Sequence, residues 1–164
     1  SGHIVLFFPR KSKKDYVVAE KPFVKTLTAF TVSMWVQMAN DSKTKKSTNA
    51  LFSYAINDDI ENEILIEMDV NIVWLSIRYT IKHLGKYYFY IDGVKKIEGV
   101  WEKGYQIRAP GAIVLGQDQD DYIGGFQEHE SLTGNLTNVN MWDKALDASR
   151  VAELAKRCPT GEGN

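Results

Sequence analysis

Carboxylate and amide side chains gather in one stretch of the sequence, between Leu115 and Glu130. The carboxylates are Asp118, Asp120, Asp121, Glu128 and Glu130, with Gln117, Gln119 and Gln127 between them. Clustered carboxylates repel one another unless water or a cation neutralises them, and Ca²⁺ takes about 6–8 oxygen ligands of these kinds. Gly124 and Gly125 allow the loop to reverse, so that oxygens from both limbs could face one point. The stretch therefore predicts either a calcium site or a solvated acidic turn.

The spacing of the acidic residues does not match the EF-hand, since D-x-D-x-D-G with glutamate at the twelfth position is absent. Histidine adds no second metal chemistry. His129 lies within the stretch, but imidazole suits softer metals than calcium, and His3 and His83 are distant in the sequence. We interpret His129 as a surface residue.

A second acidic pattern bears on enzymatic activity. Glu63, Glu67 and Asp69 stand at even spacing, which puts them on one face of an extended strand. Paired catalytic carboxyls of glycosidases lie roughly 5–10 Å apart. Alpha carbons four residues apart on a strand are separated by ~13 Å, and the middle position holds Leu65. We therefore expect a solvated strand face and no enzyme.

Length and charge limit the function classes further. A chain of 164 residues predicts one domain, residues 1–164, and the net charge of −1 creates no strong field for nucleic acid or an anionic membrane. The basic clusters Arg10–Lys14 and Lys43–Lys46 lack interleaved aromatic residues and predict solvated loops. No apolar run is long enough to span a bilayer, and no signal peptide is visible.

Cysteine and sequon positions say little about the compartment by themselves. Cys158 is the single cysteine, so no disulfide within the chain is expected, and it either stays an unpaired thiol or pairs with a cysteine of another chain or domain. Asn40 and Asn135 begin N-x-S/T sequons and are predicted glycosylation sites.

Short runs of β-branched and aromatic residues between turn signals predict an all-β fold. Ala29–Met38 alternates between apolar and more polar positions, which is typical of a strand with one face in a core. Asp92-Gly93 predicts a hairpin turn. The predicted strands are Ile4–Phe8, Tyr16–Ala19, Ala29–Met38, Ala50–Ala55, Asn62–Met68, Asn71–Thr80, Lys86–Ile91, Val94–Val100, Gly111–Leu115 and Leu136–Trp142.

One segment, Asp147–Arg157, predicts a helix. Asp147 suits the N-cap, and Val151, Leu154 and Ala155 recur at helical spacing. The sequence thus predicts an antiparallel two-sheet sandwich with one short helix near the C-terminus.

Four stretches together resemble the pentraxin family: L-T-A-F-T-V-S-M-W-V from Leu27, L-F-S-Y-A-I-N-D-D-I-E-N-E-I-L from Leu51, F-Y-I-D-G-V from Phe89, and residues 113–143, which hold G-Q-D-Q-D, S-L-T-G and N-V-N-M-W-D. The resemblance implies a jelly-roll sandwich related to laminin-G and concanavalin-like folds. It also implies secretion and a double calcium site on one face, where the ions bind phosphate esters, phosphocholine or anionic sugars directly.

The resemblance also implies which residues hold the ions. The family's acid-asparagine pair falls on Glu61 and Asn62, and its acid, glutamine carbonyl and aspartate fall on Asp118, Gln119 and Asp120. The acid and the glutamine that complete the second ion are exchanged here, as Gln127 and Glu130. The number of carboxylates is unchanged, so calcium is still expected to bind. The first ion, held by Glu61, Asn62, Asp118, Gln119 and Asp120, is expected to bind more tightly than the second.

The sequence departs from the family pattern in three ways. Ser33 replaces the first cysteine of the family's disulfide, and the segment of the second has no match. The span between Glu67 and Asp92 is shorter by roughly twenty residues, about the length of a hairpin, so either a strand pair is absent from the sandwich or residues are missing from the sequence. The chain also ends at Asn164, before the family's last strand, so the domain is expected to be part of a larger protein.

Glu67 stands where phosphocholine-binding members carry a phenylalanine against the choline methyl groups. This change disfavours choline and leaves phosphate and sugar ligands open.

Two functions remain as predictions. The first is an extracellular, calcium-dependent, lectin-like recognition domain for an anionic small molecule, a phosphate or a glycan. Calcium would order residues 116–130, and a homo-oligomer is expected from the family. The second is a metal-independent adhesion module of laminin-G type that binds an extracellular protein.

Overall fold

The computed structural model describes residues 4–39, 48–69, 72–76, 86–100 and 106–156. These residues form strands, a short 3-10 helix η1 (Glu128–Glu130) and one α-helix α1 (Ala148–Lys156). The strands are β1 (Val5–Phe8), β2 (Val17–Glu20), β3 (Thr31–Met38), β4 (Asn49–Ala55), β5 (Ile64–Asp69), β6 (Ile72–Ser76), β7 (Lys86–Ile91), β8 (Val94–Val100), β9 (Ala112–Leu115) and β10 (Gly134–Trp142).

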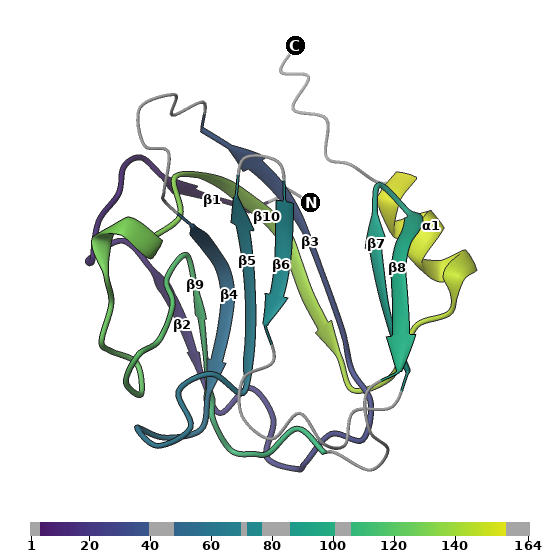
Figure 1. Ribbon diagram of the computed structural model, residues 1–164, viewed down its shortest axis with the longest axis horizontal. Coiled ribbons are helices and arrows are strands. Elements are labelled where there is room, and N and C mark those ends of the chain that lie inside the picture. The colour runs from purple at the N-terminus through teal and green to yellow at the C-terminus, as the bar shows by residue number, and fades with distance from the viewer. Residues whose placement is uncertain (1–3, 40–47, 70–71, 77–85, 101–105, 157–164) are drawn as a thin grey trace.

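The strands form two main antiparallel sheets and a separate hairpin (Figure 1). The first sheet has the order β1-β10-β3, and the second has the order β2-β9-β4-β5-β6. The hairpin is β7-β8. The all-β, antiparallel fold class predicted from the sequence is confirmed, as is one short helix near the C-terminus.

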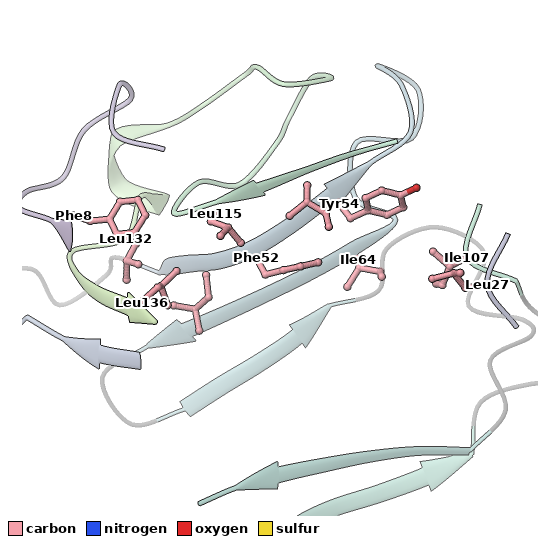
Figure 2. Close-up of a cluster of buried hydrophobic side chains, with 11 residues drawn as sticks. Phe8, Leu27, Phe52, Tyr54, Ile64, Ile107, Leu115, Leu132 and Leu136 are labelled. Atoms are coloured by element: carbon pink, nitrogen blue, oxygen red, sulfur yellow. The ribbon is translucent and has the colours of Figure 1, made fainter. Parts of the chain in front are cut away.

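Both main sheets contribute to one hydrophobic core. Phe52 and Ile64 come from the second sheet and Leu136 from the first, and all three are almost fully buried. Figure 2 shows Leu27 beside Ile107 at one end of this cluster, and Phe8 near Leu132 at the other. The core therefore extends beyond the strands to the bridge between Leu27 and Ile107 at one end and to Phe8 of β1 at the other.

The alternation in Ala29–Met38 predicted the inward face of β3 correctly. The side chains that pack against the core are Phe30, Val32, Met34, Val36 and Met38. Side chains alternate across a strand, so the intervening residues, Trp35 among them, point to the outer face.

The hairpin turn and the helix have the local chemistry expected from the sequence. Asp92 and Gly93 have φ values of 51° and 73°, as the predicted hairpin turn requires. The Arg150 amide donates to Asp147 Oδ1 at 2.9 Å, which confirms Asp147 as a cap for α1. The Ser149 hydroxyl and the Arg150 amide hold the pKa of Asp147 below its usual value.

Helix α1 packs against the hairpin turn. A Cβ built on Gly93 would lie 2.8 Å from Ala155 Cβ and 3.3 Å from Ala152 Cα. Figure 1 shows the helix beside β7 and β8. No helix in the described ranges is long and apolar enough to cross a membrane.

Leu136→Ala is expected to lower the free energy of unfolding by about 3 kcal/mol, because Leu136 is fully buried and the substitution leaves a cavity between the sheets. Urea denaturation measures the change. Val24→Ala, at a side chain that is 72% exposed, serves as the control and should stay within about 0.5 kcal/mol of the parent. Equal losses in the two variants would contradict this description of the core.

Candidate functional site

The acidic stretch forms a loop that is closed at its base. We call residues 116–131 the site loop. The Leu132 amide donates to the Gly116 carbonyl at 2.9 Å and joins the two ends of the loop. Leu132 is buried in the core, so the closing residue is also fixed by hydrophobic packing.

The site loop folds back over the outer face of the second sheet. Phe52 and Tyr54 face the core, so Ser53 between them points outward. Ser53 is nevertheless fully buried, because Gln119 covers it. The Gln119 amide nitrogen lies 3.1 Å from Ser53 Oγ, 3.2 Å from the Ser53 carbonyl and 3.2 Å from the Ala112 carbonyl.

The side chain of Gln119 is fully occupied by the protein. Its Oε1 accepts the Ile123 amide at 3.0 Å, and no part of the side chain is exposed. A metal would therefore meet Gln119 through its main-chain carbonyl, the kind of oxygen that calcium also takes.

The tip of the site loop contacts the turn between β4 and β5. The Tyr122 amide donates to Asp58 Oδ1 at 2.9 Å. Figure 1 shows the tip of the loop next to this turn, at the same end of the second sheet. Glu61 and the acidic stretch, which are distant in the sequence, are thus on adjoining segments.

The backbone at the tip is tightly turned. Asp121 and Gly124 exchange backbone hydrogen bonds of 3.3 and 3.1 Å, and Ile123 has a φ of 55°. A β-branched residue rarely adopts this left-handed conformation. The Ile123 amide bond to Gln119 helps to hold it.

Asn62 carries buried polar atoms that the described protein does not satisfy. Its side chain is 3% exposed, and neither its Oδ1 nor its Nδ2 has a hydrogen-bond partner. A buried unsatisfied polar group is costly, and most such groups in proteins are paired. An amide oxygen in this state fits the ligand chemistry of a hard cation.

A second unsatisfied oxygen belongs to Glu130, in η1. Its Oε2 is buried without a hydrogen-bond partner, whereas its Oε1 lies 3.4 Å from Nε2 of the exposed His129. Of the remaining predicted ligands in the loop, Gln127 donates to Asp120 Oδ2 at 2.7 Å, and Asp118 is 6% exposed. The loop therefore brings Asp120 and Gln127 into direct contact.

The turn that carries Glu61 and Asn62 is anchored by the next residue, Glu63. Its side chain is completely buried, and Arg108 contacts it through the backbone amide at 2.8 Å and through Nη2 at 2.6 Å. Tyr54 completes this cluster by donating to the Arg108 carbonyl at 2.9 Å. Burial raises the pKa of the Tyr54 hydroxyl, and the Glu63 carboxylate adds to the effect.

The donor set is a mixture of carboxylate, amide and main-chain oxygens. Across the parts of the chain that the structure describes, no three histidine, cysteine, aspartate or glutamate side chains form a metal-binding group. This holds for Glu61, Asp118, Asp120 and Glu130 too, so the structure places the predicted carboxylates on adjoining segments without gathering three of them at one point. Calcium, which combines carboxylates with carbonyl oxygens, fits these residues better than a softer metal does.

The other predicted residues fall on different surfaces. Glu67 lies two residues beyond Leu65, which is opposite Ser53, so Glu67 shares the outer face that the site loop covers. Asn135 lies in β10 of the first sheet, where its Nδ2 donates to Gln37 Oε1 at 2.9 Å. Asn40 lies outside the described residues.

Sequence reasoning missed the residues that hold the ligands in place. Ser53, Asp58 and Arg108 contact the site loop or its neighbouring turn, yet no spacing rule connects them to the acidic stretch. The one available signal was the amide content of the stretch itself, because glutamines between carboxylates are suited to structural hydrogen bonds.

Sequence comparison places this chain among known proteins. A profile of the Pentaxin family matches residues 70–164. The C-reactive protein of Mesocricetus auratus is 32% identical, over 88% of this chain and 72% of that protein. The C-reactive protein of Homo sapiens is 31% identical, over 88% of this chain and 72% of its own length.

A solved structure also has this fold. The heptameric SAP-like pentraxin from Limulus polyphemus superposes with a TM-score of 0.73, at 22% identity, over 92% of this chain and 80% of that one. At this identity the likeness concerns the fold alone.

Gly125→Ala is expected to destabilise the protein by about 1–3 kcal/mol, because Gly125 has a φ of 70° and a Cβ there would lie 2.6 Å from Asp120 Cβ. Thermal unfolding and amide exchange at residues 120–126 measure the effect. Gly124→Ala is the matched control, since its Cβ would meet no atom closer than 3.5 Å. If Gly124→Ala were as harmful as Gly125→Ala, the described loop geometry would be wrong.

Proposed function

This chain belongs to the pentraxin family, and on that premise we propose that it is a calcium-dependent recognition domain that binds anionic ligands, phosphate esters or glycans. Membership supports a recognition role over an enzymatic one. The observation that carries the calcium proposal is the buried, unsatisfied amide of Asn62, on a turn joined to the acidic site loop by the Tyr122–Asp58 hydrogen bond.

The first ion would take its oxygens from both segments. Its ligands are Glu61 and Asn62 from the turn, and Asp118, Asp120 and the main-chain carbonyl of Gln119 from the site loop. The occupied side chain of Gln119 supports the main-chain assignment.

The second ion would be bound by Asp118, Asp120, Gln127 and Glu130. The unsatisfied Oε2 of Glu130 supports its role as the carboxylate of this set. Gln127 Nε2 donates to Asp120 Oδ2, so its Oε1 is the atom that would bind the metal. The second ion has four proposed protein ligands and the first has five, so we expect the second to bind more weakly.

Calcium would recognise the ligand through coordination positions that the protein leaves open. A hard cation binds phosphate or sugar oxygens without an apolar wall. Glu67, on the outer face of the second sheet, puts a carboxylate where a choline-binding pocket would need an apolar side chain. This difference supports an anionic headgroup or a glycan over phosphocholine.

The relatives also bear on the location and assembly of this protein. C-reactive protein relatives support an extracellular setting. The heptameric assembly named for the Limulus neighbour supports a homo-oligomer. Light scattering with and without calcium would give the mass in solution.

Calcium is expected to raise the melting temperature of the parent chain by several degrees, because a ligand that binds only the folded state stabilises it by mass action. Asp118→Asn/Asp120→Asn should abolish the shift, since both ions lose carboxylates. Differential scanning fluorimetry with calcium and with EDTA measures it. Asp121→Asn, in the same loop but outside the proposed ligand set, should keep the shift.

Glu61→Ala extends this test to the other segment. Loss of the calcium shift is expected if turn and loop share an ion. Retention of calcium binding in Glu61→Ala would favour a laminin-G-like site, and a parent chain that gives neither heat nor a melting shift with calcium would leave only a metal-independent interaction module.

Glu67→Phe is expected to increase affinity for phosphocholine by about ten-fold while leaving calcium affinity unchanged, because an aromatic ring supplies the apolar contact that the carboxylate lacks. Calorimetry with phosphocholine and with inorganic phosphate separates the choline contribution. Glu67→Gln is the control for charge alone. No gain over Glu67→Gln would show that this position does not face the ligand.

A further inference from the structure

A short N-terminal segment runs along the site loop and contacts it in three places. The segment is Lys11–Tyr16, between β1 and β2. Its contacts fall on the first part of the loop at Gln117, on Phe126 beyond the tip, and on the last residue, Ser131. None of these three residues is a proposed calcium ligand.

The contact at the start of the loop is fully buried. Gln117 has no exposed surface, and its side-chain amide donates to the carbonyls of Ser12 and Asp15, the latter at 3.0 Å. Both of these hydrogen bonds go to main-chain oxygens of the segment, so they do not depend on the identity of its side chains. Gln117 is the residue just before Asp118, so these hydrogen bonds hold the start of the site loop against residues 12–15.

The contact at the end of the loop uses a charged donor. Lys11 Nζ donates to the Ser131 carbonyl, and it also lies 3.0 Å from Asn49 Oδ1 and 3.1 Å from the Thr48 carbonyl at the start of β4. The Ser12 amide donates to Ser131 Oγ at 3.0 Å. Lys11 thus connects the loop, the segment and the second sheet at one point.

The third contact is aromatic. The rings of Tyr16 and Phe126 have centroids 4.8 Å apart and are tilted by 51°, a favourable geometry for such pairs. Phe126 precedes Gln127, so this contact restrains the limb that carries the proposed ligands of the second ion.

These contacts bear directly on the binding of a cation. If the acidic loop became ordered only on binding calcium, the entropy cost of ordering it would lower the calcium affinity. A loop that other parts of the protein already hold in place avoids this cost. The restraints lie immediately before Asp118, immediately before Gln127 and immediately after Glu130, at both sides of the proposed ligands.

We propose that Lys11–Tyr16 is a positioning segment that holds the site loop in its binding conformation before calcium arrives, with Lys11 as its principal side chain. The effect on calcium affinity depends on the proposed function, but the effect on loop order does not. Calcium is expected from the sequence to order residues 116–130; under this proposal the contacts of Lys11–Tyr16 supply much of that loop order before calcium binds.

Lys11→Met tests the proposal against Lys13→Met. Both variants remove one positive charge from the same segment, but Lys13 is exposed, whereas Lys11 makes the contacts described above. The two variants therefore share any long-range effect of charge on calcium binding. Only Lys11→Met removes the hydrogen bonds from Nζ to Thr48, Asn49 and Ser131.

In EDTA, hydrogen exchange of the amides of residues 120–130 should be about ten-fold faster in Lys11→Met than in Lys13→Met, as expected for the loss of a hydrogen bond from a charged donor. Calorimetry should give a calcium dissociation constant about ten-fold weaker in Lys11→Met. Saturating calcium should restore the protection of the loop. Tyr16→Ala, at a side chain that is partly exposed, should speed exchange around residue 126 and keeps the test open if Lys11→Met does not fold.

The outcomes separate the two proposals. A parent chain that does not bind calcium overturns the proposed function, while the exchange rates in EDTA still decide whether the segment holds the loop. Equal exchange in Lys11→Met and Lys13→Met overturns the positioning role. Tighter calcium binding by Lys11→Met than by Lys13→Met would also overturn it, because Lys11 would then act as a competing cation.

Discussion

The buried amide of Gln119 is the contact on which the rest of the site depends. An amide removed from water must find hydrogen-bond partners within the protein. Gln119 finds them on Ser53 and Ala112 of the second sheet and on the Ile123 amide of its own loop. Satisfying this one side chain turns the loop back over the outer face of the sheet and brings its tip to the β4–β5 turn.

The buried polar groups of the site differ in whether they have hydrogen-bond partners, and Gln117 combines both states, since its Nε2 is bonded and its Oε1 is not. Gln119 and Glu63 are buried and make several hydrogen bonds, so they fix the backbone around them. Asn62 precedes Glu63 in the chain and Glu130 lies in the same loop as Gln119, and both carry buried atoms without hydrogen-bond partners. Protein groups that remain unsatisfied beside a rigid scaffold are suited to an exogenous partner, and their oxygen chemistry suits a hard cation. The scaffold and the ligands thus have different physical roles although they alternate along the sequence.

Much of the fold followed from local patterns. The alternation in residues 29–38 gave the inward face of β3, the Asp92-Gly93 pair gave the hairpin turn, and Asp147 gave the helix cap, because each depends on side chains within a few residues. The 3-10 helix of residues 128–130 was not predicted, since three residues carry too little periodicity. The outer-face packing of the site loop was not predicted either, because nothing in the local sequence of Ser53 marks Gln119 as its partner.

The sequence by itself determined the strands, the acidic loop and, through the family resemblance, the residues proposed to hold calcium. Only the tertiary structure decided how they are arranged: that Gln119 contributes its side chain to the scaffold, that Asp120 and Gln127 touch, and that residues 11–16 flank the loop. The physical reason is range. Secondary structure depends on neighbours in sequence, whereas hydrogen bonds such as Lys11 to Ser131 join residues 120 positions apart and exist only after the sheets have packed.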